Sequence, residues 1–392
     1  MTATLAADLL SRFRGDFPTQ DLDARRIAGL LEAPNCGRRL VIDAAALNLP
    51  VLTDLLDCPP AKLSPHATRR GQEFERRVLD NAMDEVIALT RTHLGMVTTE
   101  TRQLDLAPSQ MRTQNPALDK DGIRRLRLAR TRSHVEAMVN TADSALHLIR
   151  HPLLEFDLAG VTTHLELDVL SCASLGQLTP IEIKSLPLHH QTDADPHKVG
   201  AAVRQIAVYM VALRRLVIVS GGTRDQVADQ ALLVMTSGFS MRPEAFVVDM
   251  RPHVDHLEWV LAQQPNAGLV LADLPRPAIL PSPMAPEASP EEKLEIKAAT
   301  KEAVSALPMH YGDGCATCPM LAFCAKEAEL HDSVAQMGTQ AANACGSVGT
   351  ISAAFDLIGG RRMPVSGAER AVVADFSRAS AALALAGVQL DH

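Results

Sequence analysis

The chain has 392 residues, of which 38 are Lys or Arg and 46 are Asp or Glu, giving a net charge of -8. This balance excludes a protein that binds polyanions with its whole surface, although a local basic groove remains compatible with it. No apolar run is long enough to cross a bilayer. The segment Met1–Phe17 lacks the charged-then-apolar order of a signal peptide. We therefore expect a cytoplasmic protein with no membrane partner.

The first part of the chain, residues 1–57, is predicted to be mostly helical, with one strand-like apolar piece at Leu40–Ile42. Apolar residues recur at helical spacing from His66 to His93, and a second long helix is expected from Gly122 to Ile149. Within that second helix, Arg124–Arg132 forms a local basic stripe. The stripe is either a solvated helix face or a contact surface for nucleic acid.

Short strands come next. Runs over Leu165–Leu170 and Leu178–Lys184, with Gly176 between them, predict a hairpin. Further elements follow in chain order: a helix over His197–Val219, strands over Ala231–Met235 and Ala245–Val248, and a helix over His253–Ala262.

The stretch 274–290 is rich in proline, which predicts a linker or an extended arm. Ser289 then reads as an N-cap, with Pro290 at the first helical position and Glu292 completing a capping box. The helix that begins there is expected to run to Leu307. The Ala-rich tail 331–392 is predicted to be helical, and docking of a protein partner on it is a hypothesis.

One strand motif carries candidate chemistry. Alternate side chains of a strand share a face, so Glu182 and Lys184 would project together while Ile183 points into the core. The hairpin would bring Asp168 beside Glu182. Two such carboxylates can hold a divalent cation, which acidifies water and neutralises phosphoryl charge. Lys184 could position or deprotonate the attacking water. The alternative is an exposed strand face with solvated charges, because short motifs give false positives.

Two helices add candidates. Gln205 and Tyr209 are four residues apart and share one helix face, and Lys198 lies on the same stripe. Gly71 precedes Glu75 by one turn. Since glycine costs about 1 kcal/mol against alanine in a helix, close approach of another segment is a reason for it. Glu75 would then be a third acidic ligand. The plainer alternatives are a half-buried tyrosine on a polar stripe and a surface glutamate.

Seven cysteines in a chain expected to be cytosolic argue against a disulfide framework. Three of them have C-x₂-C-x₅-C spacing, which predicts a metal site that needs a fourth ligand. Either zinc or an iron–sulfur cluster satisfies this pattern. The triplet is Cys315, Cys318 and Cys324, and the candidates for the fourth ligand are Cys36, Cys58, Cys172 and Cys345.

Together these motifs resemble a known family. Gly71-x-x-x-Glu75, Asp168, Glu182-Ile-Lys184 and Gln205-x-x-x-Tyr209 occur in the order seen in RecB-type nucleases of the PD-(D/E)XK superfamily. The resemblance runs from about Cys58 to Lys326. It implies an α/β, restriction-endonuclease-like fold with a mixed central sheet flanked by helices. It also implies a Mg²⁺- or Mn²⁺-dependent DNA nuclease, in particular an exonuclease, that hydrolyses phosphodiesters through metal-activated water.

The resemblance also assigns roles. Asp168, Glu182, the Ile183 carbonyl and Glu75 would be metal ligands, and Lys184 would be the catalytic lysine. Gln205 and Tyr209 would orient that lysine and contact DNA, with Lys198 as a further DNA contact. Many relatives carry His where Glu75 stands. The residues before Asp168 are atypical for the family, so Asp157 and Glu166 are its fallbacks.

A subgroup of that family carries an iron–sulfur clasp. In AddB-type nucleases and CRISPR-associated RecB-like exonucleases, one cysteine, usually followed by proline, precedes the nuclease domain and three follow it. Cys58-Pro59 and the triplet match this order and imply a structural [4Fe–4S] cluster, with zinc as the alternative. The implied domains are 1–57, a nuclease domain over 58–330 and the tail 331–392.

The implied substrate is DNA, single-stranded or with free ends, in repair, recombination or defence against phage. The alternative function is a catalytically degenerate nuclease fold that binds DNA or a partner protein. A third class is a zinc-stabilised interaction protein whose acidic strand face is incidental.

Overall fold

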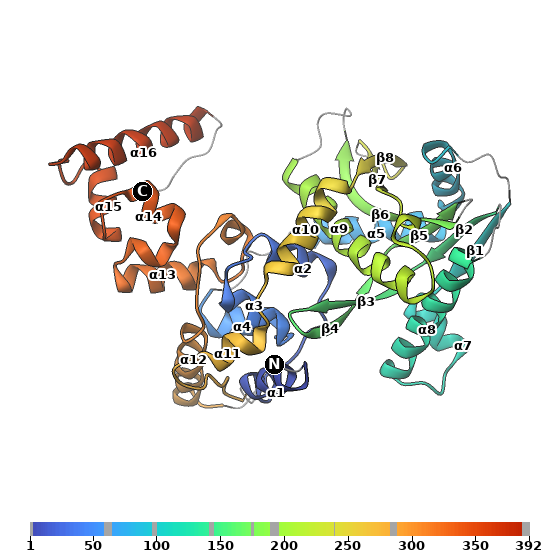
Figure 1. Ribbon diagram of the computed structural model, residues 1–392, viewed down its shortest axis with the longest axis horizontal. Helices are drawn as coiled ribbons and strands as arrows, with labels where there is room; N and C mark the ends of the chain where they lie inside the picture. The colour runs from blue at the N-terminus through green and yellow to red at the C-terminus, as the bar shows by residue number, and fades with distance from the viewer. Residues whose placement is uncertain are drawn as a thin grey trace. The chain divides into compact units, whose positions relative to one another are not determined.

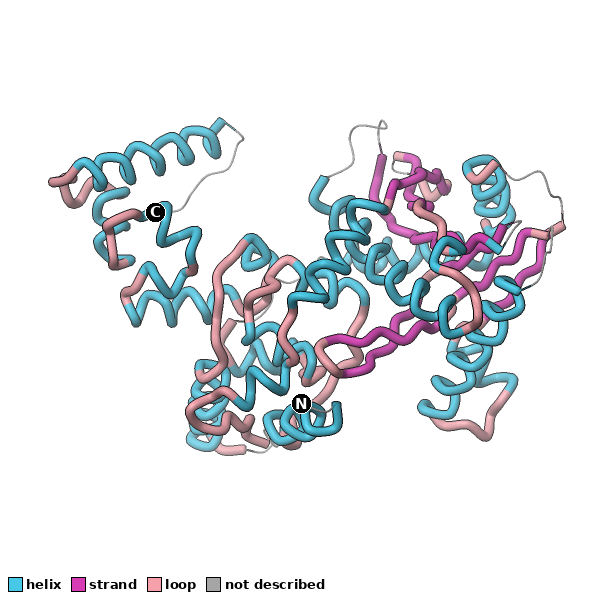
Figure 2. Tube along the Cα trace, in the orientation of Figure 1, coloured by secondary structure: helices cyan, strands magenta, loops and turns pink. Residues whose placement is uncertain are grey.

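A computed structural model describes residues 3–58, 65–95, 100–140, 145–173, 176–188, 196–238, 240–282 and 288–385 (Figures 1 and 2). The chain divides into two compact units. We call Asp21–Leu31 with Ala61–Gln264 the sheet unit, and Met1–Gln20 with Glu32–Pro60 and Pro265–His392 the helical unit. The units do not follow the predicted boundaries after residues 57 and 330. Most of residues 1–57 and all of 265–330 belong to one unit.

The sheet unit contains a mixed six-stranded sheet, which confirms the α/β class and the mixed central sheet that the resemblance implies. Its strand order is β1-β2-β5-β6-β7-β8. β1 runs parallel to β2 and β6 runs parallel to β7, whereas the other neighbours are antiparallel. β3 and β4 form a separate antiparallel pair (Figure 2). The strands are β1 (Thr101–Asp105), β2 (Leu146–Arg150), β3 (Leu153–Leu158), β4 (Val161–Glu166), β5 (Val169–Ala173), β6 (Gln177–Leu188), β7 (Gln230–Ser237) and β8 (Pro243–Asp249).

Helices flank this sheet. α5 packs on β6 and α6 packs on β8, while α9 contacts β6, β3, α2, α8 and α10. The helices of the sheet unit are α2 (Ala24–Leu31), α5 (Pro65–Asp80), α6 (Met83–His93), α7 (Pro108–Gln114), α8 (Lys120–Asn140), α9 (Pro196–Val219), the 3₁₀ turn η2 (Arg224–Gln226) and α10 (Arg251–Gln263).

The apolar core beneath α5 and α6 occupies one face of the sheet, which leaves the other face for a polar site. Phe74 and Val78 of α5 pack with Ile181 and Ile183 of β6 and with Val169 of β5. Because side chains alternate along a strand, the residues between these apolar ones point to the opposite sheet face. That face is the one that α9 covers.

The helical unit is built from short helices. α1 and α3 both contact α11, α4 contacts α12, and α13–α16 surround a second apolar core. Its elements are α1 (Ala3–Arg14), α3 (Gly37–Ala44), α4 (Leu49–Leu55), α11 (Ala267–Ala272), α12 (Pro290–Ser305), η3 (Asp313–Thr317), α13 (Leu321–His331), η4 (Val334–Met337), α14 (Thr339–Cys345), α15 (Ile351–Ile358) and α16 (Gly367–Leu385).

Three predicted elements are wrong. Leu40–Ile42 lies inside helix α3, because a short, fully buried apolar run does not distinguish strand from helix. The helix expected to reach Ile149 ends at Asn140, and β2 begins at Leu146.

The strand expected over Leu165–Leu170 is also broken in the structure. Its first two residues end β4, and β5 begins only at Val169. The intervening Leu167 and Asp168 bond through their backbones to Pro152 and His151 instead.

Other elements are confirmed. α9, β7, β8 and α10 match their predicted ranges closely. The capping box is present, since Ser289 Oγ accepts from the amide of Glu292, whose carboxylate accepts from the Ser289 amide. The helical spacing over His66–His93 is realised as two helices, α5 and α6. Among the described residues, no helix is long and apolar enough to cross a membrane.

Candidate functional site

The acidic-lysine motif of β6 forms a compact cluster with Asp168, in which Glu182 is buried and Asp168 and Lys184 are half-buried. Val169 pairs with Ile181, so Asp168, one residue earlier, is level with Glu182. Asp168 Oδ2 accepts a hydrogen bond of 2.7 Å from the Ile183 amide. Lys184 Nζ lies 2.5 Å from Glu182 Oε1. The structure therefore brings these predicted site residues together on the α9 side of the sheet.

Burial dominates the electrostatics of this cluster. It raises the pKa of Glu182, and the charge of Asp168 raises it further, against the opposing effect of Lys184. Burial likewise raises the pKa of Asp168, again opposed by Lys184. Burial lowers the pKa of Lys184, but the charges of Glu182 and Asp168 outweigh it, so the net shift is upward. Lys184 is consequently an ammonium group at neutral pH in this state.

Glu182 has an unsatisfied carboxylate. Its side chain is 0% exposed. Apart from the ion pair with Lys184, no described residue donates a hydrogen bond to either of its oxygens. A buried carboxylate with so few partners is costly, and a divalent cation would satisfy it. Within the described parts of the chain, however, no three His, Cys, Asp or Glu side chains converge on one point as a complete metal site.

Replacing Glu182 by glutamine is expected to raise the melting temperature of the metal-free protein. The pKa of Glu182 in the native state lies above its unfolded value of 4.5. Above pH 4.5 the native state therefore keeps this proton while the unfolded state loses it. The buried carboxylate therefore destabilises the native state increasingly as pH rises. Removing the carboxylate should raise the free energy of unfolding by about 1–2 kcal/mol and the melting temperature by a few degrees. Thermal melts from pH 5 to 8 should show the difference growing with pH.

The matched control for this prediction is Glu155→Gln, a change of an exposed glutamate on β3. It should leave the melting temperature unchanged. Adding Mg²⁺ should stabilise the wild type and narrow the difference. A melting temperature of the Glu182→Gln variant at or below the wild type throughout this pH range would show that burial of the carboxylate is not destabilising.

Glu75 lies beside the cluster but does not complete it. Burial raises its pKa, whereas the charge of Lys184 lowers it, which places Glu75 within electrostatic range of the lysine. Glu75 and His151 line a cavity of about 250 Å³. A Cβ added at Gly71 would meet Ser185 Oγ at 3.4 Å, an ordinary contact. α5 therefore runs beside β6 without an approach tight enough to require glycine.

His151 is a site residue that sequence reasoning missed. Its backbone has φ of 53°, and its amide donates to the Asp168 carbonyl over 2.9 Å. Its Nδ1 lies 3.2 Å from Glu166 Oε1, and Glu166 also pairs with Arg127 over 2.5 Å. Burial lowers the pKa of His151, but Glu166 outweighs it and the net shift is upward. No motif marks this residue, because its position depends on its backbone pairing with Asp168.

The predicted pair on α9 is formed. Gln205 Nε2 donates to Tyr209 Oη over 3.0 Å. Tyr209 is 3% exposed, and burial together with the charges of Glu182 and Asp168 raises its pKa well above the ordinary value. Tyr209 thus stays protonated behind the acidic strand. Lys198 is exposed in the first turn of α9, two turns before Gln205.

The two fallbacks for Asp168 lie elsewhere. Asp157 is 64% exposed on β3 and pairs with Arg215 over 3.5 Å. Glu166 already contacts two basic side chains, Arg127 and His151. Asp168 is therefore the carboxylate that lies level with Glu182.

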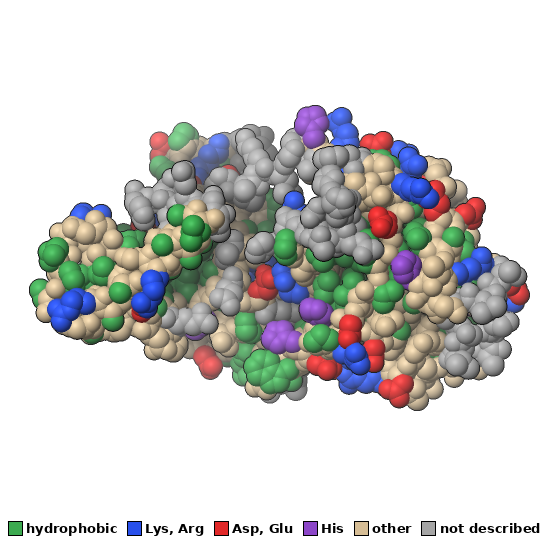
Figure 3. Space-filling view, turned by 90° about the horizontal axis from the view of Figure 1, so that it is seen from above, with side chains coloured by type: hydrophobic (Ala, Val, Ile, Leu, Met, Phe, Trp, Pro, Cys, Tyr) green, Lys and Arg blue, Asp and Glu red, His purple; other side chains and the backbone are tan. Residues whose placement is uncertain are grey.

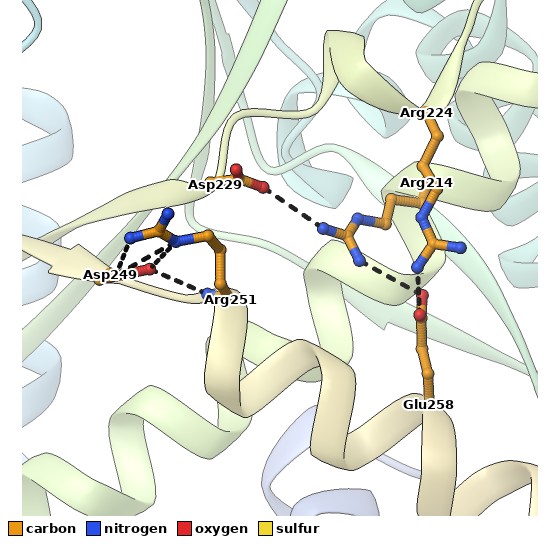
Figure 4. Close-up of polar contacts among 6 residues, drawn as sticks. All are labelled: Arg214, Arg224, Asp229, Asp249, Arg251 and Glu258. Atoms are coloured by element: carbon orange, nitrogen blue, oxygen red, sulfur yellow. Dashed lines mark hydrogen bonds and ion pairs between the residues drawn. The ribbon is translucent and has the colours of Figure 1, made fainter.

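An ion-pair network holds α9 in place (Figure 4). Arg214 of α9 lies 3.6 Å from Asp229 Oδ1 and 3.4 Å from Glu258 Oε1 on α10. Arg224 also pairs with Glu258. Since Arg214 is only 8% exposed, this network fixes α9 against the segment before β7. It thereby supports the helix that carries Gln205 and Tyr209.

The basic stripe of α8, Arg124–Arg132, is partly engaged in ion pairs within the protein. Arg127 is buried and paired with Glu166, and Arg124 lies 3.3 Å from Asp21 Oδ2. On the face seen in Figure 3, acidic and basic side chains lie next to one another rather than gathering by sign.

The helical unit contains Cys58 and the predicted triplet. All seven cysteines are described, and none is in a disulfide. Three of the four proposed ligand sulfurs receive an N–H donor: Arg38 donates to Cys324 at 3.2 Å, Arg39 to Cys318 at 3.7 Å, and the Gly312 amide to Cys315 at 3.4 Å. At the fourth, Cys58, burial raises the pKa and the Phe323 backbone opposes this shift.

The other cysteines have different surroundings. Cys36, at the N-cap of α3, lies within electrostatic range of Cys315 and Cys324. Cys345 packs in the apolar core of α13–α16, where burial raises its pKa. Cys172 is buried on β5 of the sheet unit. For comparison, burial raises the pKa of Cys324 to about 11 against the opposing charge of Arg38.

Comparisons with known proteins do not place the chain in a family. No protein-family model matches it, and no curated protein does. Among solved structures, one match is titled "Crystal structure of SSO0001". It is 14% identical, covers 49% of this chain and 85% of that chain, and has a TM-score of 0.17. A likeness at this TM-score carries no argument about fold or function.

Proposed function

We propose that this protein is a Mg²⁺- or Mn²⁺-dependent DNA nuclease with a restriction-endonuclease-like sheet and a structural [4Fe–4S] cluster. One observation carries the catalytic part. The Glu182 carboxylate is buried beside Asp168, and Lys184 is its one described polar partner. Buried ionisable groups with shifted pKa values cluster at functional sites, where burial and neighbouring charges adjust the pKa to the chemistry.

Each residue of the cluster then has a task. Asp168, Glu182 and the Ile183 carbonyl would hold the cation, with Glu75 approaching from α5. The cation would supply Lewis-acid stabilisation of phosphoryl charge and a more acidic water. With Glu182 holding the cation, the Lys184 ammonium would be available to donate to the attacking water and to the charge that develops on the phosphate.

The charge state of Lys184 favours one of its two predicted roles. Because its pKa is raised, the ammonium donates hydrogen bonds and does not accept a proton in the metal-free state. Positioning water and stabilising negative charge fit this state better than deprotonating water. Tyr209, held by Gln205, would fix the strand from the α9 side.

The helical unit contains the four thiols proposed as cluster ligands, although no three of them converge as a complete metal site among the described residues. Thiolates that bind iron commonly accept N–H donors, which orient the ligands and tune the cluster. Three of the four proposed sulfurs have such a donor, and two of the three donors are guanidinium groups. Cys58 and the triplet also lie in one compact unit. Cys58, Cys315, Cys318 and Cys324 would therefore hold the cluster in a structural role.

A second candidate is a degenerate nuclease fold that binds DNA or a partner protein. It is favoured by one observation, the incomplete convergence of Glu75, Asp168 and Glu182 among the described residues. In that reading, the pair of Lys184 with Glu182 is permanent and no cation displaces it.

Purified protein is expected to degrade DNA when Mg²⁺ or Mn²⁺ is present and to stop when a chelator is added. The reason is that the buried carboxylates need the cation to bind and activate phosphate. End-labelled single- and double-stranded DNA, with and without free ends, measure the cleavage. DNA binding without cleavage under every metal condition would favour the degenerate fold, and neither binding nor cleavage would contradict both candidates.

A further inference from the structure

We propose that Arg38 and Arg39 are positioning residues of the thiol cluster, which orient Cys324 and Cys318 and make the bound cluster longer-lived and easier to reduce. This inference rests on the proposed function, because it needs the [4Fe–4S] cluster to be present. It concerns two residues that the strand and cysteine motifs do not include. Both are consecutive residues of helix α3.

Arg38 is held in one orientation. It is 1% exposed, and one of its guanidinium nitrogens lies 3.2 Å from Cys324 Sγ and 2.7 Å from Glu327 Oε2. Its other terminal nitrogen donates to the Leu307 carbonyl over 3.3 Å. The guanidinium also lies 5.5 Å from the ring centroid of Phe323, a cation–π distance. The N–H that points at Cys324 is thus fixed by its surroundings.

Arg39 repeats the arrangement at a second cysteine. It is 6% exposed, it forms a buried ion pair with Asp43 one turn later, and its Nη1 lies 3.7 Å from Cys318 Sγ. Adjacent residues on a helix point in directions about 100° apart. Two neighbouring arginines that each reach a different cysteine of one triplet therefore indicate a surface built around the sulfurs.

The start of α3 is fitted to the segment before the triplet. The Arg38 amide donates to the Pro308 carbonyl over 2.8 Å. A Cβ added at Gly37 would lie 2.8 Å from Pro308 Cγ, closer than side-chain carbons pack. Glycine at this position therefore allows α3 to approach closely enough for the two arginines to reach the cysteines.

Charge compensation alone does not explain where these arginines point. Arg38 already has Glu327, and Arg39 already has Asp43, so each guanidinium is paired without any sulfur. A neutral thiol is a weak acceptor, whereas a thiolate accepts a charge-assisted bond from guanidinium. The geometry therefore suits thiolates that ligate metal. Hydrogen bonds to ligand sulfurs also shift the reduction potential of an iron–sulfur cluster.

The test uses the full chain, purified anaerobically, as Arg39→Gln and Arg38→Lys variants. We expect both variants to bind iron but to lose their visible absorbance about tenfold faster in a chelator. Their midpoint potential in a dithionite titration should lie below that of the wild type, because a donor to sulfur is lost or weakened. Arg362→Gln is the control, since Arg362 pairs with Glu369 over 2.8 Å in the helical unit. It should match the wild type in both readouts.

Every outcome is decisive. Variants with wild-type potential and chelator lifetime would overturn the inference while leaving the cluster in place. Wild-type protein that contains zinc or no metal would overturn the proposed cluster, and the inference with it. If Arg38→Lys fails to fold, as a circular dichroism melt would show, the Arg39→Gln measurements decide alone.

Discussion

Replacing Lys184 by alanine is expected to slow metal-dependent DNA cleavage by about 10³-fold, the cost of losing one fixed donor to developing charge. The ammonium lies 2.5 Å from Glu182 Oε1 and 31% of its side chain is exposed. It is therefore anchored among the carboxylates and still reachable by substrate. The loss should fall on kcat with little change in KM, because the proposed interaction strengthens in the transition state. Single-turnover cleavage of labelled DNA at saturating Mn²⁺ measures it.

Two variants make this result interpretable. Lys293→Ala removes an exposed lysine of α12 and should leave the rate unchanged. Lys184→Arg keeps the charge but replaces a compact ammonium by a planar guanidinium, so it should recover only part of the activity. If Lys184→Ala cleaved DNA at the wild-type rate, the assignment of the active site to β6 would be wrong.

The cluster around β6 could be predicted from the sequence because it depends on local rules. Strand alternation puts Glu182 and Lys184 on one face and Ile183 in the core, and the structure agrees. Helix periodicity similarly predicted the contact of Gln205 with Tyr209. Both patterns are short in sequence and regular in geometry, so a single sequence is enough to reveal them.

The position of Asp168 beside Glu182 was also predicted, but two other features of the site were not, because they depend on backbone pairing between separate segments. The first is an irregular step before β5, in which residues 167 and 168 bond to residues 151 and 152. The same pairing brings His151 to the site from the end of β2. A continuous strand over Leu165–Leu170 was the simpler expectation, and it concealed both features. Likewise, Leu40–Ile42 resembled a strand, which concealed the helix that presents Arg38 and Arg39 to the cysteines.

The choice of the fourth cluster ligand depends on the family resemblance rather than on cysteine spacing. Spacing alone leaves four candidates, and the family resemblance selects Cys58. The structure places Cys58 within electrostatic range of Cys318, one cysteine of the triplet. Cys36 complicates the choice because it lies within electrostatic range of Cys315 and Cys324. Replacement of each cysteine in turn distinguishes the two candidates.

Replacing Cys58 by alanine is expected to remove the iron and its visible absorbance and to destabilise the protein by up to about 5 kcal/mol. This free energy is the loop-closure entropy that a covalent cross-link between residues 58 and 315 removes from the unfolded chain. Strain in the native state would reduce it. Iron analysis and urea denaturation, followed by circular dichroism, measure the two effects. Cleavage by the surviving folded fraction should persist, because all the proposed catalytic residues lie in the sheet unit.

Cys36→Ala and Cys345→Ala are the matched controls, since both remove a buried cysteine of the helical unit. Each should keep its iron and lose only the stability that a small buried side chain contributes, about 1 kcal/mol. Loss of iron in Cys36→Ala with retention in Cys58→Ala would transfer the fourth ligand to α3. The cluster would then be held by a helix and the triplet that it already contacts through Arg38 and Arg39, and it would no longer tie the chain at residue 58.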